Sequence, residues 1–201
     1  MTVIGITGPT GAGKTTVLDV LARLGGEVVD CDAVYHELLH TNGPMRDELR
    51  ARFGTEIFDK NGDLRRKALG AIVFGDETAL ADLNAITHRH IVAELEQRIT
   101  RARAKGRPAI ALDAIALLES GAGGLCDVTI AVTAPEDVRV RRIMAREGIS
   151  ERYAQARVSA QKPSAWFEER CTHTLRNDGV REDFEARAQN LFEEILCKED
   201  K

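Results

Sequence analysis

One short segment near the N-terminus has residue types and spacing suited to binding a chain of phosphates. It reads Gly8-Pro-Thr-Gly-Ala-Gly-Lys-Thr15 and fits the pattern GxxxxGK[ST]. Small residues let the backbone curl so that successive N–H groups point at phosphate oxygens, and a following helix adds the positive end of its dipole. Lys14 would reach the β- and γ-phosphates of a nucleoside triphosphate, and the Thr15 hydroxyl would bind Mg²⁺. The alternative is a glycine-rich turn that binds nothing.

Carboxylates follow two apolar segments. Val28-Val-Asp-Cys-Asp32 ends one of them, and the two-residue period of a strand puts Asp30 and Asp32 on the same side. At the carboxyl end of a parallel strand, such a group can accept a proton from an attacking hydroxyl. Asp32 could also cap the next helix, and Asp30 could be structural. Asp113 ends another apolar segment, where it is either an Mg²⁺-organising carboxylate or a polar strand end.

Arginines recur in a segment later in the chain. Thr133 and Glu136 have the spacing of a capping box, which predicts a helix start. Arg139, Arg142 and Arg146 then share one helical face. Guanidinium groups that close over transferring phosphates stabilise their charge, and a lid that excludes water favours transfer over hydrolysis. The alternative is a solvated charged face whose arginines pair with acids such as Glu147 and Glu151.

The elements that must position these groups alternate between strand and helix. Strands are predicted at 3–7, 27–30, 109–113, 128–133 and 173–176, with a helix from Lys14 and another near the C-terminus. This order predicts an α/β fold with a five-stranded parallel sheet between two helical layers, as in P-loop NTPases. We expect one domain with a core at about 1–32, 106–135 and 170–201, a helical insertion at about 33–105 and a lid at about 136–169.

Composition narrows the class of protein. Of 201 residues, 43% are hydrophobic and 30% are charged, and the formal net charge is −4. This indicates an ordinary globular protein without general attraction for nucleic acid or anionic membranes. Four dispersed cysteines form no metal or disulfide pattern, and neither a secretory signal nor a membrane-spanning stretch is visible. We therefore expect a cytoplasmic protein with reduced thiols.

The phosphate loop alone does not separate kinases from ATPases and GTPases. The guanine signature Asn-Lys-x-Asp of regulatory GTPases is absent, and motor and transporter ATPases tend to be larger. The arginine-rich segment instead suggests a lid. The combination therefore favours a kinase that uses ATP and Mg²⁺ to phosphorylate a small molecule.

Several motifs in order resemble the dephospho-CoA kinase family. They are Gly-Ile-Thr-Gly-(x)2-Gly-x-Gly-Lys-Thr at 5–15, Val-Asp-x-Asp-x3-His at 29–36, Leu-Asn-x3-His at 83–88, Asp-x5-Glu at 113–119, then Arg-x3-Arg, Ala-Gln and Asn-Asp-Gly at 177–179. The resemblance runs over almost the whole chain. The paired aspartates and the Asn84–His88 element are more specific than the phosphate loop.

This resemblance implies transfer of the ATP γ-phosphate to the 3′-hydroxyl of the dephospho-CoA ribose, giving CoA and ADP. By similarity Asp32 is the general base, Lys14 and Arg142 complete the catalytic set, and the insertion binds the acceptor. The residues implied to hold ATP are Gly11, Ala12, Gly13, Lys14, Thr15 and Thr16, with Arg146 over the phosphates and Asn177 near the adenine. Those implied on the acceptor side are Asp30, Asn84, His88 and Asp113, although the residues alone favour a core role for His88.

Two positions depart from the family pattern in the acceptor region. Arg89 stands where the family often has proline, and no proline lies between Asp113 and Glu119. Both changes predict an altered pocket shape. Two alternatives remain open: another small-molecule kinase acting on a nucleoside monophosphate or a sugar, and a nucleotide-binding homologue without catalysis. The sequence gives no oligomeric state.

Overall fold

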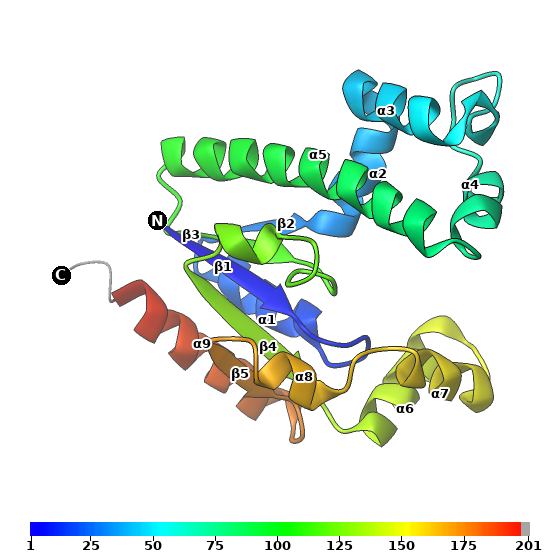
Figure 1. The fold of residues 1–201 in the computed structure, drawn as a ribbon. Coiled ribbons are helices and arrows are strands. Elements are labelled where there is room, and N and C mark those ends of the chain that lie inside the picture. Colours follow the sequence, from blue (N-terminus) through cyan, green and yellow to red (C-terminus); the bar gives the residue numbers. More distant parts are fainter. Residues whose placement is uncertain (198–201) are drawn as a thin grey trace.

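The protein is built on a fully parallel five-stranded sheet. The structure is a computed structural model that describes residues 1–197. The strands are β1 (Thr2–Thr7), β2 (Glu27–Asp30), β3 (Ala109–Asp113), β4 (Val128–Thr133) and β5 (His173–Arg176), and their order in the sheet is β2-β3-β1-β4-β5 (Figure 1). All the predicted strands are confirmed, and β1 starts one residue earlier than expected. Because β1 and β3 are buried along most of their length, their apolar runs need cover on both faces.

Two helical layers provide that cover. Helices α1 (Lys14–Arg23) and α9 (Arg181–Cys197) pack on one face, where their apolar stripes meet β1 and β4. Helix α5 (Glu77–Ala104) and the segment around the short helix η2 (Ala122–Leu125) pack on the other. The predicted three-layer α/β arrangement is therefore confirmed (Figure 1).

A helical insertion follows β2 and returns to β3. It comprises α2 (Cys31–Thr41), α3 (Gly43–Phe53), η1 (Thr55–Ile57), α4 (Arg66–Val73) and the long helix α5. The side chains of Asn42 and Asp76 accept hydrogen bonds from the first N–H groups of α3 and α5 and fix where these helices begin. Buried side chains of the insertion join those of one sheet face in one continuous cluster. The insertion is thus anchored to the sheet by apolar packing.

A smaller helical unit separates β4 from β5. It contains α6 (Glu136–Glu147), α7 (Glu151–Ser159) and α8 (Ser164–Glu168). Helices α6 and α7 bury a small cluster of their own, made by Val140, Ile143, Ala154 and Val158. Because this cluster is separate from the two sheet clusters, α6 and α7 pack together as a unit beside the sheet.

The predicted capping box at the start of α6 is wrong. The residue before the helix is Pro135, and no side chain caps this end within the described chain. The hydroxyl of Thr133 donates instead to Glu168 Oε1, at 2.9 Å. The side chain is directed away from α6 because Thr133 is still part of β4 and is buried.

Two further expectations can be compared with the structure. Cys31, Cys126, Cys171 and Cys197 are free thiols. Among the described residues, no helix combines the length and the apolar character that crossing a membrane requires.

Candidate active site

The glycine-rich loop joins the end of β1 to the start of α1. Gly8 has a φ of 138°, and a Cβ there would lie 2.0 Å from the carbonyl oxygen of Val132. Gly13 has a φ of 105°, and a Cβ there would lie 2.2 Å from Nδ2 of Asn177. Both positions need glycine because the backbone adopts a left-handed conformation against close neighbours. The loop therefore has the tight curl that its sequence predicts.

Helix α1 begins at Lys14 without a side-chain cap in the described structure. Its first N–H groups lack the helical partners that later residues have, and the helix dipole adds partial positive charge at this end. The Thr16 N–H donates to the Gly13 carbonyl at 3.1 Å, and the Thr15 side chain is exposed. This end of α1 can therefore accept an anion, with the Thr15 hydroxyl available to a ligand.

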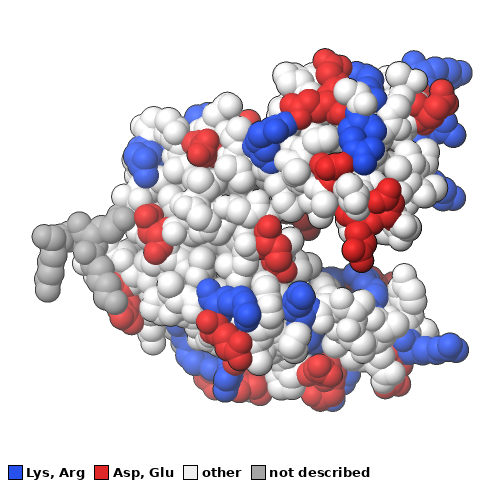
Figure 2. All heavy atoms as spheres, viewed as in Figure 1, with Lys and Arg blue, Asp and Glu red and all other residues white. Residues whose placement is uncertain are grey.

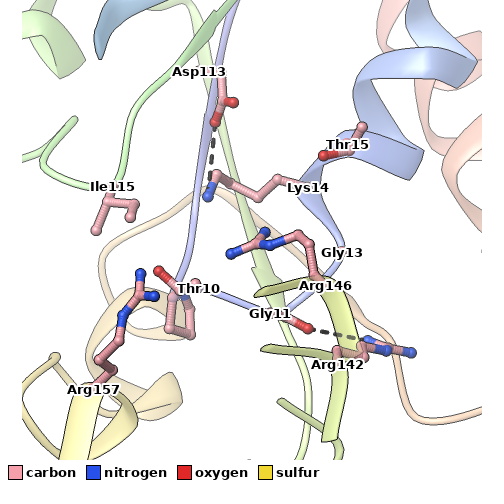
Figure 3. A pocket seen from close by; sticks show the side chains of 11 residues that line it. Thr10, Gly11, Gly13, Lys14, Thr15, Asp113, Ile115, Arg142, Arg146 and Arg157 are labelled. Carbon is pink, nitrogen blue, oxygen red and sulfur yellow. Dashed lines mark hydrogen bonds and ion pairs between the residues drawn. The ribbon is translucent and has the colours of Figure 1, made fainter. Parts of the chain in front are cut away.

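A cavity of about 340 Å³ opens over this loop. Its lining includes four cationic side chains, Lys14, Arg142, Arg146 and Arg157, and one carboxylate, Asp113. In Figure 3, Arg146 and Arg157 approach the loop from helices α6 and α7. A cavity with this excess of positive charge suits a polyphosphate.

Lys14 and Asp113 form the charged floor of the cavity. Lys14 Nζ lies 3.9 Å from Asp113 Oδ1 (Figure 3), and it donates to the Gly8 carbonyl at 3.3 Å. Burial lowers the pKa of Lys14, and the charges of Asp113 and Asp32 oppose that shift. Burial raises the pKa of Asp113 to about 6, although the Lys14 charge works against the rise. Both groups therefore lie where water solvates charge poorly.

Arg142 and Asn177 brace the loop from behind. Arg142 Nη1 donates to the carbonyls of Gly11 and Ala12 at 3.3 Å, and its Nη2 donates to Asn177 Oδ1 at 3.1 Å. Asn177 Nδ2 donates to the Ala12 carbonyl at 2.9 Å, and its side chain is buried. Arg142 thus contacts Gly11 and Ala12, whereas Asn177 contacts Ala12 and lies close to Gly13. The proximity of Asn177 to adenine stays a prediction.

A second group of side chains holds Thr10, and sequence reasoning missed both Gln161 and this role of Arg139, which was expected on the lid face. Gln161 accepts from the Thr10 N–H at 3.0 Å and donates to its hydroxyl at 2.8 Å. Arg139 donates to the Thr10 carbonyl at 3.0 Å and to Gln161 Oε1 at 2.9 Å. Arg139 is only 1% exposed, so this guanidinium is a buried positive charge beneath the loop. The sequence gives no pairwise signal for these contacts, because Thr10 and Gln161 lie 151 positions apart.

Two arginines of the α6–α7 unit pair with one acid. Glu147 binds both Arg146 and Arg157, and Arg146 Nη2 lies 2.7 Å from Glu147 Oε1. Arg146 also lies close enough to Lys14 to lower its pKa. Arg157 was not among the predicted site residues. It enters the cavity from α7, beyond the arginine-rich segment that the sequence analysis used.

A second cavity, of about 230 Å³, lies between α2, α5 and the chain after β3. Most of its lining is apolar or small, and it includes Cys31, Asp32, Tyr35, Leu83, Asn84, Thr87, His88, Ile91, Ala114, Ala116, Ser120 and Ala122. The two cavities are neighbours, because Asp113 and Ile115 line the first while Ala114 and Ala116 line the second. A small molecule in the second cavity would therefore lie beside a polyphosphate in the first.

Asp30 and Asp32, at the junction of β2 and α2, have different positions from those predicted. Helix α2 starts at Cys31, so Asp30 ends the strand and Asp32 belongs to the first helical turn. The cap of α2 is Asp30, whose Oδ1 accepts from the N–H groups of Asp32 and Ala33 at 2.9 and 3.0 Å. The expectation of a shared strand side is therefore wrong, as is that of an Asp32 cap. Asp32 is left exposed beside the second cavity.

Asn84 and His88 lie on the cavity side of α5, four residues apart, as the sequence predicts. His88 is partly buried, and burial lowers its pKa, which favours the neutral imidazole. A neutral ring offers one hydrogen-bond donor and one acceptor to a ligand in this cavity. His88 is thus not a buried core residue, and its contact with the acceptor stays a prediction.

The departure at position 89 has a structural counterpart. Arg89 ion-pairs with Glu48 on α3, and the same carboxylate lies 3.1 Å from His90 Nε2. The arginine therefore helps to hold α5 against α3 and does not line the cavity. After Asp113, the chain without proline runs through a turn in which Ala114 and Ala116 face the cavity.

The oxygen donors near the loop suit an ion such as Mg²⁺, which phosphates and water help to bind. They do not suit a metal held by protein groups alone. In the described residues no group of three or more acids, histidines or cysteines could hold an ion. Asp113 Oδ1 is buried and makes no hydrogen bond, and the Thr15 hydroxyl lines the same cavity. Mg²⁺ typically binds one or two protein oxygens and completes its shell with phosphates and water. Both residues fit that pattern.

Comparison with known proteins agrees with this geometry. The family model described as dephospho-CoA kinase matches residues 2–183. A dephospho-CoA kinase from Corynebacterium efficiens is 34% identical over 195 residues, which cover 97% of this chain and 98% of that protein. The crystal structure of TT1252 from Thermus thermophilus is 34% identical with a TM-score of 0.77, covering 96% of this chain and 97% of the other. A dephospho-CoA kinase from Campylobacter jejuni, 23% identical over 98% of both chains, shares the fold with a TM-score of 0.71.

Proposed function

Because the chain belongs to the dephospho-CoA kinase family, we propose that its two neighbouring cavities bind ATP and dephospho-CoA for phosphoryl transfer between them. The enzyme phosphorylates the ribose 3′-hydroxyl of dephospho-CoA and releases CoA and ADP, which is the last step of coenzyme A biosynthesis. In this reaction a bond forms between the 3′-oxygen and the γ-phosphorus, the bond from that phosphorus to the β-phosphate oxygen breaks, and the hydroxyl proton must be accepted.

The loop after β1 and the start of α1 form the ATP half of the proposal. N–H groups of the loop and of the uncapped first turn of α1 hold the phosphates, and Lys14 neutralises charge on the β- and γ-phosphates. The backbone of residues 11–16 supplies most of this binding. Arg142 and Asn177 fix the conformation of the loop. Their hydrogen bonds to the Gly11 and Ala12 carbonyls support this role.

The lid supplies the remaining positive charge. Arg146 and Arg157 reach the phosphate cavity from α6 and α7, and Glu147 holds them together. In Figure 2 a notch opens between the helical insertion and the helical lid, and blue cationic atoms lie on the lid side of this notch. Closure of the lid over bound ATP would place guanidinium groups on the transferring phosphate and exclude water.

The second cavity holds the acceptor in this proposal. Asn84 and His88 offer polar contacts among mainly apolar surroundings, as small-molecule sites commonly do. Asp32 accepts the proton of the 3′-hydroxyl or orients it toward the γ-phosphate. Asp30 acts by capping the helix that carries Asp32, which supports a positioning role.

Mg²⁺ would be held by Thr15 and by Asp113 Oδ1, which makes no hydrogen bond in the described structure, together with ATP oxygens. When bound, the ion neutralises negative charge on the phosphates. Asp113 additionally positions Lys14 through their ion pair, which lies between the two cavities. The assignment of 33–105 to acceptor binding and of 136–169 to the lid belongs to the same proposal, and the cytoplasmic location stays a prediction.

One observation carries the proposal. Asp32 lines the acceptor cavity and is also near enough to Lys14, in the phosphate cavity, for its charge to oppose the lowering of the Lys14 pKa. The Asp32 carboxylate and the Lys14 ammonium therefore lie close to the boundary of the two cavities, which supports their proposed roles as proton acceptor and phosphate-binding cation. This is the arrangement that transfer to a hydroxyl requires.

The test is an ADP-release assay with Mg²⁺-ATP and a panel of acceptors: dephospho-CoA, AMP, CMP, adenosine and none. We expect release that depends on dephospho-CoA, with formation of CoA shown by mass. ADP release only with another acceptor would refute dephospho-CoA as the acceptor but would still show kinase activity. If no acceptor produced ADP release although ATP still bound, the result would favour a non-catalytic nucleotide-binding protein.

A further inference from the structure

An apolar groove of about 210 Å³ adjoins the acceptor cavity on the insertion. It lies between α2 and α4 and is lined by Tyr35, Leu39, Leu64, Arg66, Leu69, Gly70, Val73, Phe74 and Leu83. Tyr35 and Leu83 line both this groove and the acceptor cavity. The groove and the acceptor cavity are therefore separated by these two side chains. A ligand that extends from the cavity past Tyr35 would enter the groove.

Where the groove adjoins the acceptor cavity, the Arg66 guanidinium supplies a positive charge. Arg66 Nη2 lies 3.1 Å from His36 Nδ1, and in the described structure Arg66 forms no ion pair with a carboxylate. Arg66 is also close to Tyr35, since its charge opposes the rise in the Tyr35 pKa that burial causes. Among the described residues that line the groove, this guanidinium is the only charged group, and the others are apolar except for the Tyr35 hydroxyl. An anionic group that passes Tyr35 would meet Arg66.

At the outer rim, Phe74 is 88% exposed. It follows the last turn of α4, and a Cβ on Gly70 would lie 3.0 Å from its ring, so glycine leaves room for the ring to lie beside the groove. An aromatic side chain left this exposed gains little from folding, because its apolar surface remains in water. Its surface is available to a ligand chain that lies in the groove.

We propose that this groove binds the pantetheine arm of dephospho-CoA, with Arg66 facing the diphosphate. The inference rests on the proposed function, because the 3′-hydroxyl must lie at Asp32 in the acceptor cavity. Dephospho-CoA has an adenosine part, a negatively charged diphosphate and a long, uncharged arm. The cavity, the Arg66 junction and the apolar groove follow one another in the same order. Charge and polarity of the protein thus match the substrate along its length.

Steady-state kinetics of Phe74→Ala and Arg66→Gln test this inference. Both side chains are exposed, so the variants should fold like the wild type. We expect each to raise the KM for dephospho-CoA about tenfold, the loss that corresponds to one good contact. The kcat and the KM for ATP should change less than about twofold, because the reacting atoms are untouched.

Controls lie next to each variant. Ile72→Ala removes a half-exposed apolar side chain of α4 that does not line the groove. Arg65→Gln removes the neighbouring arginine, whose Nη1 lies 4.0 Å from Glu56. Neither should change the KM for dephospho-CoA.

Inhibition by 5′-AMP separates the two halves of the acceptor site. AMP has the adenosine part without the pantetheine arm, so its inhibition constant against dephospho-CoA should not change in Phe74→Ala. An unchanged KM for dephospho-CoA in both variants would overturn the inference. A parallel rise in the AMP inhibition constant in Phe74→Ala would also overturn it, because the groove would then hold adenine. A wild-type enzyme inactive with dephospho-CoA would instead refute the function on which the inference rests.

Discussion

The phosphate side of the site and the acceptor side are held in place by different interactions. Around the phosphate loop, backbone groups bond to the buried side chains of Arg139 and Asn177 and to the partly buried side chains of Arg142 and Gln161. Around the acceptor cavity, apolar side chains of α2 and α5 make most of the wall, and few polar groups face inward. A loop that must bind phosphate with its own backbone needs fixed geometry, whereas a cavity that encloses an organic molecule needs shape and an apolar lining.

This difference has a consequence for mutation. In the phosphate half, loss of one polar partner leaves another buried polar group unpaired and disturbs the loop. In the acceptor half, a lost side chain changes contact with one substrate only. We therefore expect variants of the two halves to differ in which substrate they affect, and Asp32 at the boundary to affect transfer itself.

The largest effect is expected for Asp32→Asn. The amide cannot accept the hydroxyl proton, so kcat should fall roughly 100- to 10,000-fold, the usual contribution of a general base. The affinity for ATP should stay nearly unchanged, because Asp32 lines the acceptor cavity. Turnover numbers and ATP titration measure both quantities. Turnover equal to that of the wild type would remove Asp32 from the mechanism.

Lys14→Ala should impair both ATP use and turnover. The lysine lines the phosphate cavity and pairs with Asp113, so its loss removes a cation that acts on bound ATP and on the charge of the transition state. A drop in kcat/KM for ATP of roughly 100- to 1,000-fold is the scale for removing one preorganised electrostatic group. Initial rates at varied ATP provide the measurement, and a fully active variant would refute the assignment of the loop.

Gln161→Ala should have a smaller effect, confined to the phosphate half. It removes two hydrogen bonds to Thr10 and one to the buried Arg139, which loosens the loop. We expect the KM for ATP to rise about tenfold and the KM for dephospho-CoA to stay constant. The matched control is Gln155→Ala on α7, whose side chain donates to Glu151 on the same helix and has no hydrogen bond to the loop in the described structure. Equal behaviour of the two variants would contradict the bracing role.

The smallest effect concerns pH. Because the pKa of Asp113 is raised to about 6, this carboxylate takes up a proton as pH falls through that value and its ion pair with Lys14 is lost. The kcat/KM for ATP should therefore decrease below about pH 6, and Asp113→Asn should lack that part of the decrease. Titration of ATP itself is common to both enzymes, so the difference between the profiles isolates Asp113. Identical profile shapes would exclude its titration as the cause.

The sequence predicts the sheet and the phosphate loop well, for a local reason. Buried parallel strands are continuous apolar runs in the sequence. Glycines mark the turns at the ends of elements, as at Gly8 after strand β1 and Gly25 after helix α1. Lys14 and Thr15 are fixed by their position in the motif. These features depend on neighbours in the chain, which the sequence displays directly.

The sequence predictions fail where a side chain can bond to residues far along the chain, and where the end of a helix or strand decides a residue's role. The strand period was extended to Asp32, but α2 had already begun at Cys31, with Asp30 as its cap. Thr133 was expected to cap α6, but Glu168, 35 positions away, takes its hydroxyl hydrogen bond. Arg157 and Gln161 were not found for the same reason, because only the packing of the lid against the loop brings them to the site.

The measurement that tests the two-part site most directly is hydrogen exchange of the wild-type enzyme with ADP alone and with dephospho-CoA alone. We predict that ADP slows exchange in residues 8–16 and in the lid helices α6 and α7, while dephospho-CoA slows it at the start of α2 and around residues 83–91 of α5. The two sets of protected segments should meet only near residues 31–35 and 113–116. Protection of the phosphate loop by dephospho-CoA, with none on α5, would contradict the assignment of the second cavity to the acceptor.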